Sequence, residues 1–197
     1  MNCNDNFIFI HIPKCGGMSI TKGLGLKVSL DMHTTITEII DEDLIQNRFT
    51  FSFVRNPFDR LVSWYHFHFK RNDYNFPDTF QKWIISSLDD EDFYGGNRWI
   101  NQEHPKDPLT LLPWISHNNK VAVDYVGKIE TLTYDVNEIA KQSGIKLYNN
   151  IQHRNKSNNS GTSMKRDSNY RTYYTTSTKR IVKRRYEEDL EYFKYHF

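Results

Sequence analysis

Cysteines are scarce in this sequence, and long apolar runs are absent. Cys3 and Cys15 are the only cysteines among 197 residues, which excludes a disulfide scaffold and favours a reducing compartment. They do not form a CxxC pair of the kind that binds zinc. The longest apolar stretch near the N-terminus, residues 7–10 with Ile12 after it, is too short for a signal-peptide core or a membrane span. We therefore expect a cytoplasmic protein with no membrane anchor.

A large excess of charge of one sign is also lacking. Lys and Arg number 26 and Asp and Glu 24, so the formal net charge is +2, too small to indicate a nucleic-acid partner. An anionic ligand must then be bound by local groups. The contents of 38% hydrophobic and 15% aromatic residues are too high for a disordered chain, and the length favours a single domain over residues 1–197.

Segments typical of strands and of helices alternate along the chain. Residues 7–12, ended by Pro13, and residues 49–54 are near-continuous runs of β-branched and aromatic residues, the pattern of parallel strands buried on both faces. Residues 121–126 predict a further strand. Helices are predicted over residues 18–25, 34–47, from Pro57 onward, 79–88, 134–142 and 176–193, and a loop over 149–169. This alternation predicts an α/β fold.

The turn after the first predicted strand is suited to binding an anion. Its sequence is His11-Ile12-Pro13-Lys14-Cys15-Gly16-Gly17-Met18-Ser19-Ile20. Glycines let the backbone approach a ligand, and helix N–H groups with one lysine can hold phosphate-type oxygens. Because Lys14 precedes the glycines and no Gly-Lys-Ser/Thr follows, this is not a Walker A loop. It is not a Cys-based phosphatase loop either, since Thr21 stands where that loop needs an arginine. The alternative is a plain β-α turn with a solvated lysine.

A second polar motif follows the second predicted strand. It is Phe53-Val54-Arg55-Asn56-Pro57-Phe58-Asp59-Arg60-Leu61-Val62-Ser63-Trp64-Tyr65, with Asn56 as the helix N-cap and Pro57 at the first helical position. The apolar stripe of this helix leaves Asp59 and Ser63 on a different face. A guanidinium fork and a hydroxyl suit a phosphate monoester, which favours Arg55 and Ser63 as ligands. The alternative is a structural ion pair between Arg55 and Asp59.

Taken together, the two motifs resemble those of the PAPS-dependent carbohydrate sulfotransferases, the family that includes the heparan 2-O and chondroitin enzymes. Further similarity lies in residues 123–132, Val-Asp-Tyr-Val-Gly-Lys-Ile-Glu-Thr-Leu, and in the tyrosines from Tyr170 to Tyr174. The resemblance implies a P-loop-like, three-layer α/β domain with a central parallel sheet flanked by helices. It also implies PAPS (3′-phosphoadenosine 5′-phosphosulfate) as the donor, PAP as the released product and no metal.

The same resemblance implies which residues bind PAPS. The turn Pro13, Lys14, Cys15, Gly16, Gly17, Met18 and Ser19 should hold the 5′-phosphosulfate, and Arg55 with Ser63 should hold the 3′-phosphate. Arg154, Lys156 and Ser157, in a polar loop, form a second group of ligands, with a simple solvated loop as the alternative. Cys15 and Met18 stand where the family often has threonine, so one hydroxyl contact is absent and donor affinity is expected to be lower.

Two residues are expected to carry the chemistry. An acceptor hydroxyl attacks sulfur in line, so the site needs a base for the acceptor proton and a cation for the developing negative charge. Lys14 suits the second role. His33 suits the first, because histidine titrates near neutral pH and His33 precedes a predicted helix between the two motifs. In heparan 2-O-type relatives a catalytic histidine also lies between the PAPS motifs. The alternative is a histidine that only hydrogen-bonds to backbone.

The remaining polar residues favour structural roles. His66 and His68 point to different faces of one helix, which disfavours a shared metal, and His11 is expected to be a satisfied core residue. The basic run 179–185 could bind a polyanion, but acidic residues 187–189 follow four positions after residues 183–185 and should neutralise it along one helix. Most of Trp64, Trp83, Trp99 and Trp114 are expected in the core or at its rim.

The sequence therefore predicts a sulfotransferase that moves a sulfuryl group from PAPS to a hydroxyl of a carbohydrate or sugar-containing small molecule. The chain is short for the family, with no room for the anchor and stem of Golgi members, so we expect a minimal soluble form. A P-loop-type small-molecule or nucleotide kinase is one alternative, although its Walker lysine is missing and it would need Mg²⁺. A non-catalytic module that binds PAPS or PAP is the other.

Overall fold

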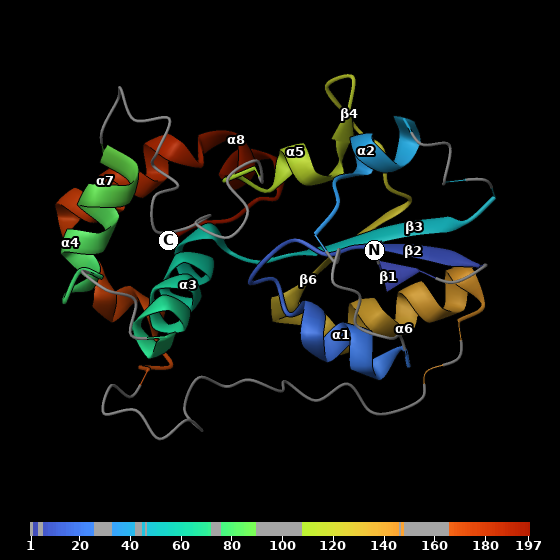
Figure 1. The fold of residues 1–197 in the computed structure, drawn as a ribbon, viewed down its shortest axis with the longest axis horizontal. Helices are drawn as coiled ribbons and strands as arrows, with labels where there is room; N and C mark the ends of the chain where they lie inside the picture. Colours follow the sequence, from blue (N-terminus) through green and yellow to red (C-terminus); the bar gives the residue numbers. More distant parts are fainter. Residues whose placement is uncertain are drawn as a thin grey trace. The chain divides into compact units, whose positions relative to one another are not determined.

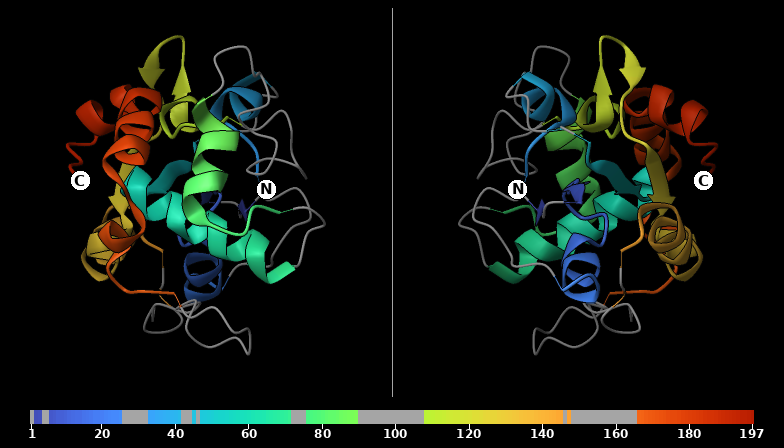
Figure 2. Two further views of the ribbon diagram at one scale, coloured as in Figure 1. Left: turned by 90° about the vertical axis from the view of Figure 1, so that its left-hand side faces the viewer. Right: turned by 90° about the vertical axis from the view of Figure 1, so that its right-hand side faces the viewer.

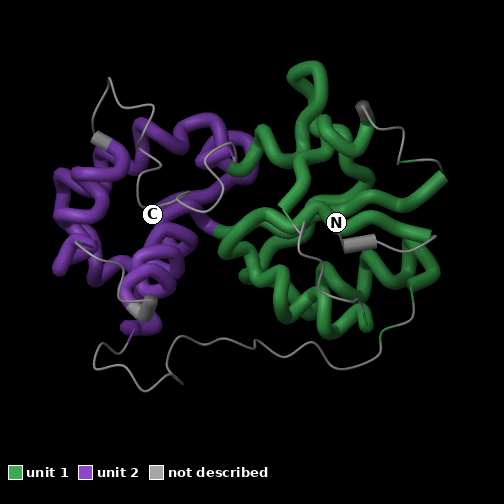
Figure 3. Tube along the Cα trace, viewed as in Figure 1, with its two compact units in different colours: residues 1–55, 111–155 green, residues 56–110, 156–197 purple. Residues whose placement is uncertain are grey.

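The computed structural model divides the chain into two compact units. One comprises residues 1–55 and 111–155, and the other residues 56–110 and 156–197 (Figure 3). The structure describes residues 2–3, 6–25, 33–41, 45, 47–71, 76–89, 108–145, 147 and 166–197. The first unit contains the main sheet, and the described part of the second unit is helical.

The first unit is built on a four-stranded sheet of order β1-β2-β3-β6. Its strands are β1 Asn2–Cys3, β2 Phe7–Ile10, β3 Phe49–Val54 and β6 Tyr125–Lys128. Strands β2, β3 and β6 run parallel, with Ile8 opposite Thr50 and Phe51 opposite Tyr125. Only β1 is antiparallel to its neighbour. This confirms the predicted mixed α/β class with a parallel sheet.

The two central strands are buried as their composition predicts. Every residue of β2 is buried, and so is every residue of β3 after Phe49. The Phe9 and Phe51 rings stack across the two strands with centroids 5.2 Å apart. Aromatic cross-strand pairs of this kind fix the register of neighbouring strands, which sets where the turns after them lie.

Helices flank the sheet on both sides (Figures 1 and 2). Helices α1 Gly17–Gly23 and α6 Leu132–Ser143 lie on one side, and α2 Ile36–Asp41 and α5 Leu112–Ile115 on the other. The first pair completes a core of strand phenylalanines with side chains of Ile20, Leu24, Val136 and Ile139. The helix predicted over residues 134–142 is therefore confirmed, and Gly144 ends it with a φ of 70°.

The strand predicted over residues 121–126 is wrong in its bounds. Residues 120–121 form β5 Lys120–Val121, which pairs with β4 Ser116–His117 in a separate hairpin, and β6 begins at Tyr125. Asp124 explains the gap, because its Oδ2 accepts hydrogen bonds from Thr50 N at 2.7 Å and Thr50 Oγ1 at 2.8 Å. Asp124 N also donates to Thr50 O at 2.9 Å, so both the side chain and the backbone of Asp124 bond to β3 just before β6 begins.

The helix predicted over residues 34–47 is shorter in the structure. Helix α2 spans Ile36–Asp41, and Ile45 is not helical. Thr35 precedes the helix, and its N–H donates to Glu38 Oε2 at 2.7 Å, which sets the start one turn before the acidic residue. Arg48 N donates to Ile45 O at 2.8 Å just before β3, so Ile45 and Arg48 belong to the connection between α2 and β3.

The described part of the second unit is helical, and its first helix confirms the N-cap prediction. The helices are α3 Pro57–Arg71, α4 Phe80–Ile84 with a π-helical turn Ile85–Asp89, α7 Thr176–Arg185 and α8 Glu187–Tyr192. Asn56 Oδ1 accepts from Phe58 N at 3.0 Å. Phe58, Leu61, Val62 and Tyr65 are at most 2% exposed, so the predicted stripe is the buried face.

The single helix predicted over residues 176–193 is interrupted at Tyr186. Its backbone leaves helical geometry there, with φ −116° and ψ 22°. The Tyr186 ring is buried, and Asp189 in the next helix is buried too. The acidic residues 187–189 therefore open a new helix and do not continue the basic one, and Arg185 Nε donates to Leu88 O at 2.7 Å. The prediction of one continuous helix is therefore wrong, whereas the neutralisation of the basic residues by the acidic ones stays a prediction.

None of the helices within the described ranges is long and apolar enough to cross a membrane.

Asp135 anchors the end of β6 to α6. This buried carboxylate accepts hydrogen bonds from Tyr125 Oη at 2.8 Å, Lys128 N at 3.0 Å and Thr131 Oγ1 at 2.5 Å. Burial of the Tyr125 hydroxyl, followed by its hydrogen bond to Asp135, raises the pKa of Tyr125. Three donors are thus satisfied by one side chain.

We expect Asp135→Ala to lower the free energy of unfolding by about 2–3 kcal/mol, because partly buried donors lose their acceptor. Urea denaturation followed by circular dichroism measures this. Lys141→Ala, at an exposed position of the same helix, is the matched control and should change stability by less than about 0.5 kcal/mol. Equal effects of the two substitutions would show that the Asp135 contacts do not stabilise the sheet.

Candidate functional site

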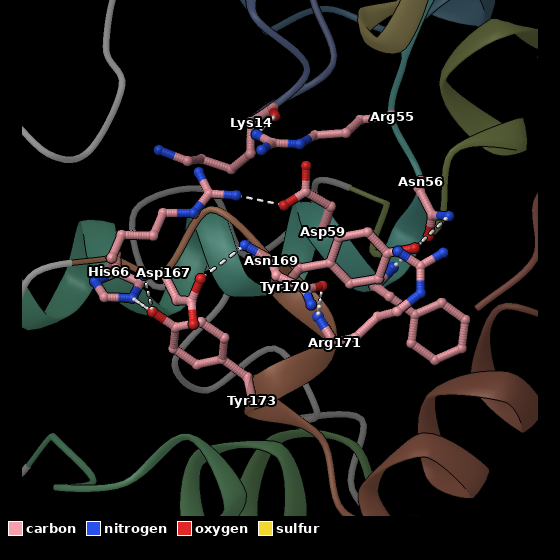
Figure 4. Close-up of polar contacts among 12 residues, drawn as sticks. Lys14, Arg55, Asn56, Asp59, His66, Asp167, Asn169, Tyr170, Arg171 and Tyr173 are labelled. Carbon is pink, nitrogen blue, oxygen red and sulfur yellow. Dashed lines mark hydrogen bonds and ion pairs between the residues drawn. The ribbon is translucent and has the colours of Figure 1, made fainter.

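The turns that follow β2 and β3 meet at one edge of the sheet. Because these strands are parallel, their carboxyl ends lie side by side. Arg55, directly after β3, donates from Nη1 to the carbonyl oxygen of Lys14 at 3.2 Å (Figure 4). The two predicted motifs are thus joined within the first unit by a side-chain contact at their cationic residues.

The turn from Pro13 to Gly17 holds an unusual backbone conformation. Lys14 has a φ of 66° and Gly16 a φ of 75°. The left-handed region costs a non-glycine residue roughly 1–2 kcal/mol. Cys15 N donates to Ile12 O at 3.2 Å and Ser19 N to Gly16 O at 2.9 Å, which fixes the turn. Strain of this kind is concentrated at functional sites in proteins.

Burial within this turn alternates between inward and outward residues. Pro13, Cys15, Gly17 and Ser19 are buried, whereas Lys14, Gly16 and Met18 are half-buried. The contribution of Cys15 to a ligand is therefore limited to its backbone, and the side chain of Lys14 reaches the surface of the unit.

The ring of His11 packs directly on Gly17. A Cβ built on Gly17 would lie 1.7 Å from His11 Nε2 and 1.9 Å from Cδ2. No side chain larger than hydrogen fits at residue 17 while the imidazole stays in place. The second glycine of the motif is thus explained by a contact with the first residue after β2.

His33 forms a hydrogen bond with the backbone of His11. Its Nδ1 lies 2.9 Å from His11 O. A carbonyl oxygen only accepts, so Nδ1 carries the hydrogen, and in the neutral ring the basic lone pair is then on Nε2. The His33 ring lies 4.6 Å from the His11 ring and 6.2 Å from that of Trp114, centroid to centroid. The backbone hydrogen bond foreseen as an alternative is present.

His11 itself is not the satisfied core residue that the sequence suggests. It is buried as expected, but its Nδ1 has no hydrogen-bond partner. Burial, followed by the neighbouring His33 and Lys14, lowers the pKa of His11 to about 3. The ring therefore stays neutral at physiological pH.

Ser63 and the acid of the second motif lie on α3 in the second unit. Ser63 is half-buried on the face predicted for it, one turn after Asp59. The carboxylate of Asp59 forms an ion pair with Arg166 (Figure 4). Asn56 Nδ2 donates to Tyr170 Oη at 3.3 Å and to His196 O at 2.8 Å. Asp59, which the sequence suggested as a possible partner of Arg55, thus pairs with Arg166 in its own unit.

Residues 166–174 form several hydrogen bonds with α3. His66 Nε2 lies 2.7 Å from Tyr173 Oη, which also accepts from Asp167 N at 2.8 Å. Tyr174 Oη donates to Phe58 O at 2.8 Å. Burial raises the pKa of Tyr173, so this hydroxyl stays protonated at neutral pH. The two histidines of α3 are both buried and serve separate contacts, since His68 stacks with Phe76.

Several predicted residues lie outside the described part of the chain. Arg154, Lys156 and Ser157 are among them, as is Trp99, so their roles stay predictions. Trp64, Trp83 and Trp114 are at most 4% exposed, which confirms their assignment to the core. Among the described residues, no group of three or more His, Cys, Asp or Glu side chains is placed to hold a metal ion.

The sequence analysis did not identify the roles of two side chains, Arg166 and His11. Arg166 lies in a stretch without periodicity, so no sequence pattern marked it, and only its ion pair with Asp59 draws attention to it. The contact of the His11 ring with Gly17 was missed because it joins residues at the two ends of a turn. A histidine at the end of a strand otherwise composed of Phe and Ile is the one signal that could have singled out His11.

A parallel sheet whose strand-to-helix turns gather a lysine, an arginine and a histidine pair at one edge defines an α/β protein suited to anionic ligands. The chain belongs to the sulfotransferase family: the family model described as "Sulfotransferase family" matches residues 1–196. This confirms the resemblance noted in the sequence. An uncharacterized protein from Archaeoglobus fulgidus is 30% identical over 110 residues, which are 54% of this chain and 76% of that protein. No solved structure gives a significant match.

The low pKa of His11 predicts how stability depends on pH. In the unfolded chain the ring takes up a proton near pH 6.5, whereas in the folded protein it does so near pH 3. The unfolded state therefore binds more protons between these values, and stability falls as the pH drops below about 6.5. Between pH 6.5 and 4.5 we expect the wild type to lose about 2–3 kcal/mol more stability than His11→Phe, measured by urea denaturation. Parallel pH curves would contradict the assignment of a buried neutral ring.

Proposed function

We propose that this chain transfers a sulfuryl group from PAPS to a hydroxyl of a carbohydrate or sugar-containing acceptor and releases PAP. Family membership supports sulfotransferase activity. The observation that carries the proposal is the hydrogen bond from His33 Nδ1 to His11 O, because it assigns the ring hydrogen to Nδ1 and makes Nε2 the basic nitrogen of His33. We also propose that residues 1–197 act as one P-loop-like domain.

The donor is assigned to the two motifs. The turn from Pro13 to Ser19 holds the phosphosulfate through its backbone N–H groups and Lys14, and the buried Cys15 contributes no side-chain contact. Arg55 binds the 3′-phosphate together with Ser63, with Arg154, Lys156 and Ser157 as further ligands. The hydrogen bond from Arg55 Nη1 to the Lys14 carbonyl oxygen supports this role, because it positions the guanidinium next to the turn that holds the phosphosulfate.

The chemistry is assigned to His33 and Lys14. His33 Nε2 takes the proton of the acceptor hydroxyl as the acceptor oxygen forms its bond to sulfur. Lys14 offsets the negative charge that develops on the phosphate oxygen as its bond to sulfur breaks. His33 then returns the proton to water. The His33 ring lies 4.6 Å from the His11 ring, centroid to centroid, and after burial both His33 and Lys14 contribute to the lowered pKa of His11.

The carbohydrate acceptor is inferred from the resemblance to carbohydrate sulfotransferases. The half-buried His33 is reachable from solvent, as a base for an incoming hydroxyl must be. Its ring packs near those of His11 and Trp114, and its Nδ1 bonds to the His11 carbonyl oxygen, so these contacts orient the ring before the acceptor binds.

The donor assignment is tested by calorimetric titration with PAP, 5′-AMP and ATP with Mg²⁺ in parallel. We expect PAP to bind without metal and more tightly than 5′-AMP, since the 3′-phosphate supplies charge-assisted contacts. Arg55→Ala should weaken PAP binding by about tenfold or more and leave 5′-AMP binding nearly unchanged. Preference for Mg²⁺-ATP would favour a kinase, and equal losses for both nucleotides would refute the 3′-phosphate assignment.

The base assignment is tested by His33→Ala. We expect turnover of a PAPS-dependent transfer assay to fall about 100-fold or more, with PAP affinity retained, because a general base contributes to the chemical step. The matched control is His117→Ala, a half-buried histidine in the β4–β5 hairpin of the same unit. Normal turnover in His33→Ala would place the base elsewhere, and wild-type protein that binds PAP without any transfer would favour the non-catalytic module.

A further inference from the structure

Residue 11 carries a polar ring where an apolar ring would fit with less cost. The His11 ring stacks on Phe9 with centroids 5.6 Å apart, and its Nδ1 is enclosed without a hydrogen-bond partner. An enclosed polar atom without a partner is unfavourable, and phenylalanine would stack there without that penalty. The backbone carbonyl that receives His33 does not require an imidazole either. We therefore look to the second ring nitrogen, Nε2, to explain why residue 11 is a histidine and not a phenylalanine.

Nε2 of His11 lies where a side chain of residue 17 would start. Three ring atoms, Nε2 among them, come within 2.4 Å of the position of a Cβ on Gly17. In a Walker A loop, the residue that follows the last glycine is the lysine that reaches the phosphates. Gly17 follows Gly16 at this place, and the edge of the His11 imidazole fills the volume that such a side chain would occupy.

The proton of the neutral His11 ring belongs on Nε2. A neutral imidazole has one N–H and one bare nitrogen. An enclosed N–H without a partner is rarer in proteins than an enclosed acceptor without one, so Nδ1 is the bare nitrogen. Of the two ring nitrogens, only Nδ1 is both enclosed and without a partner. The ring thus presents a donor at the Gly17 end of the turn.

We propose that His11 is a further anion-binding residue, whose Nε2–H donates a hydrogen bond to a phosphate-type oxygen of the nucleotide held by the turn from Pro13 to Gly17. The identity of that nucleotide as PAPS or PAP rests on the proposed function. The role differs from that of Lys14, which supplies charge, and from that of His33, whose Nε2 accepts a proton. His11 adds a donor that does not change with pH across the physiological range.

Two substitutions of His11 distinguish the effect of its Nε2–H donor from the effect of its ring. His11→Phe keeps the stacked ring and the backbone carbonyl but removes the N–H, whereas the amide nitrogen of His11→Gln reaches about as far as Nε2. In calorimetric titration with PAP we expect His11→Phe to lose about tenfold in affinity at every pH from 6 to 8. His11→Gln should lose less than about threefold. His117→Ala, which removes a half-buried histidine of the β4–β5 hairpin, is the matched control and should leave PAP affinity nearly unchanged.

Nitrogen NMR of the wild type tests the same proposal without a substitution. We expect His11 to show the Nε2–H tautomer between pH 5 and 8 and its Nε2 signal to shift on addition of PAP or inorganic pyrophosphate. An Nδ1–H tautomer would overturn the proposal, and so would wild-type PAP affinity in His11→Phe. If His11→Phe does not fold, as judged by circular dichroism, the wild-type NMR result decides.

The experiments also distinguish an error in the proposed function from an error in the role of His11. If wild-type protein does not bind PAP, the donor assignment is lost. The titration with pyrophosphate then decides on His11 alone: a shift of its Nε2 signal supports an anion site at this turn, and an unchanged signal overturns it.

Discussion

The parallel pairing of β2 with β3 is the constraint on which the candidate site depends. It places the turn after each strand at the same edge of the sheet, and the contact between Arg55 and the Lys14 carbonyl follows from that register. Burial of both strands on both faces makes the register hard to shift, because a slip by one residue would exchange the side chains of the two faces. The strained backbone at Lys14 is sustained by this frame.

The polar cluster at that edge is organised around a ring that cannot ionise at neutral pH. His11 touches Gly17 on one side and receives the hydrogen bond of His33 at its backbone on the other. Because burial keeps the pKa of His11 near 3, its ring stays neutral at physiological pH. The buried His11 is therefore unsuited to act as a base, and the proposed function assigns that role to the half-buried His33.

The main elements were predictable from the sequence because their signals are local. The composition of β2 and β3, the Asn56 cap of α3 and Gly144 after α6 each depend on neighbouring residues, and all are confirmed. The start of β6 and the break at Tyr186 were not predictable, since they depend on Asp124 bonding to Thr50 and on the burial of the Tyr186 ring. Among site residues, the motifs marked Lys14 and Arg55, whereas the role of the His11 ring depends on a contact across a turn.

The order in which the sheet strands occur in the chain has a consequence for synthesis. The chain passes between the two units at residues 55–56, 110–111 and 155–156, so neither unit is one continuous segment. Strand β3 pairs with β6, whose first residue, Tyr125, follows its partner Phe51 only after the whole of α3 and α4. On the ribosome, the apolar edge of β3 must therefore stay without its neighbour until Lys128 has emerged, and this interval is when the nascent chain is most exposed to pairing with another chain.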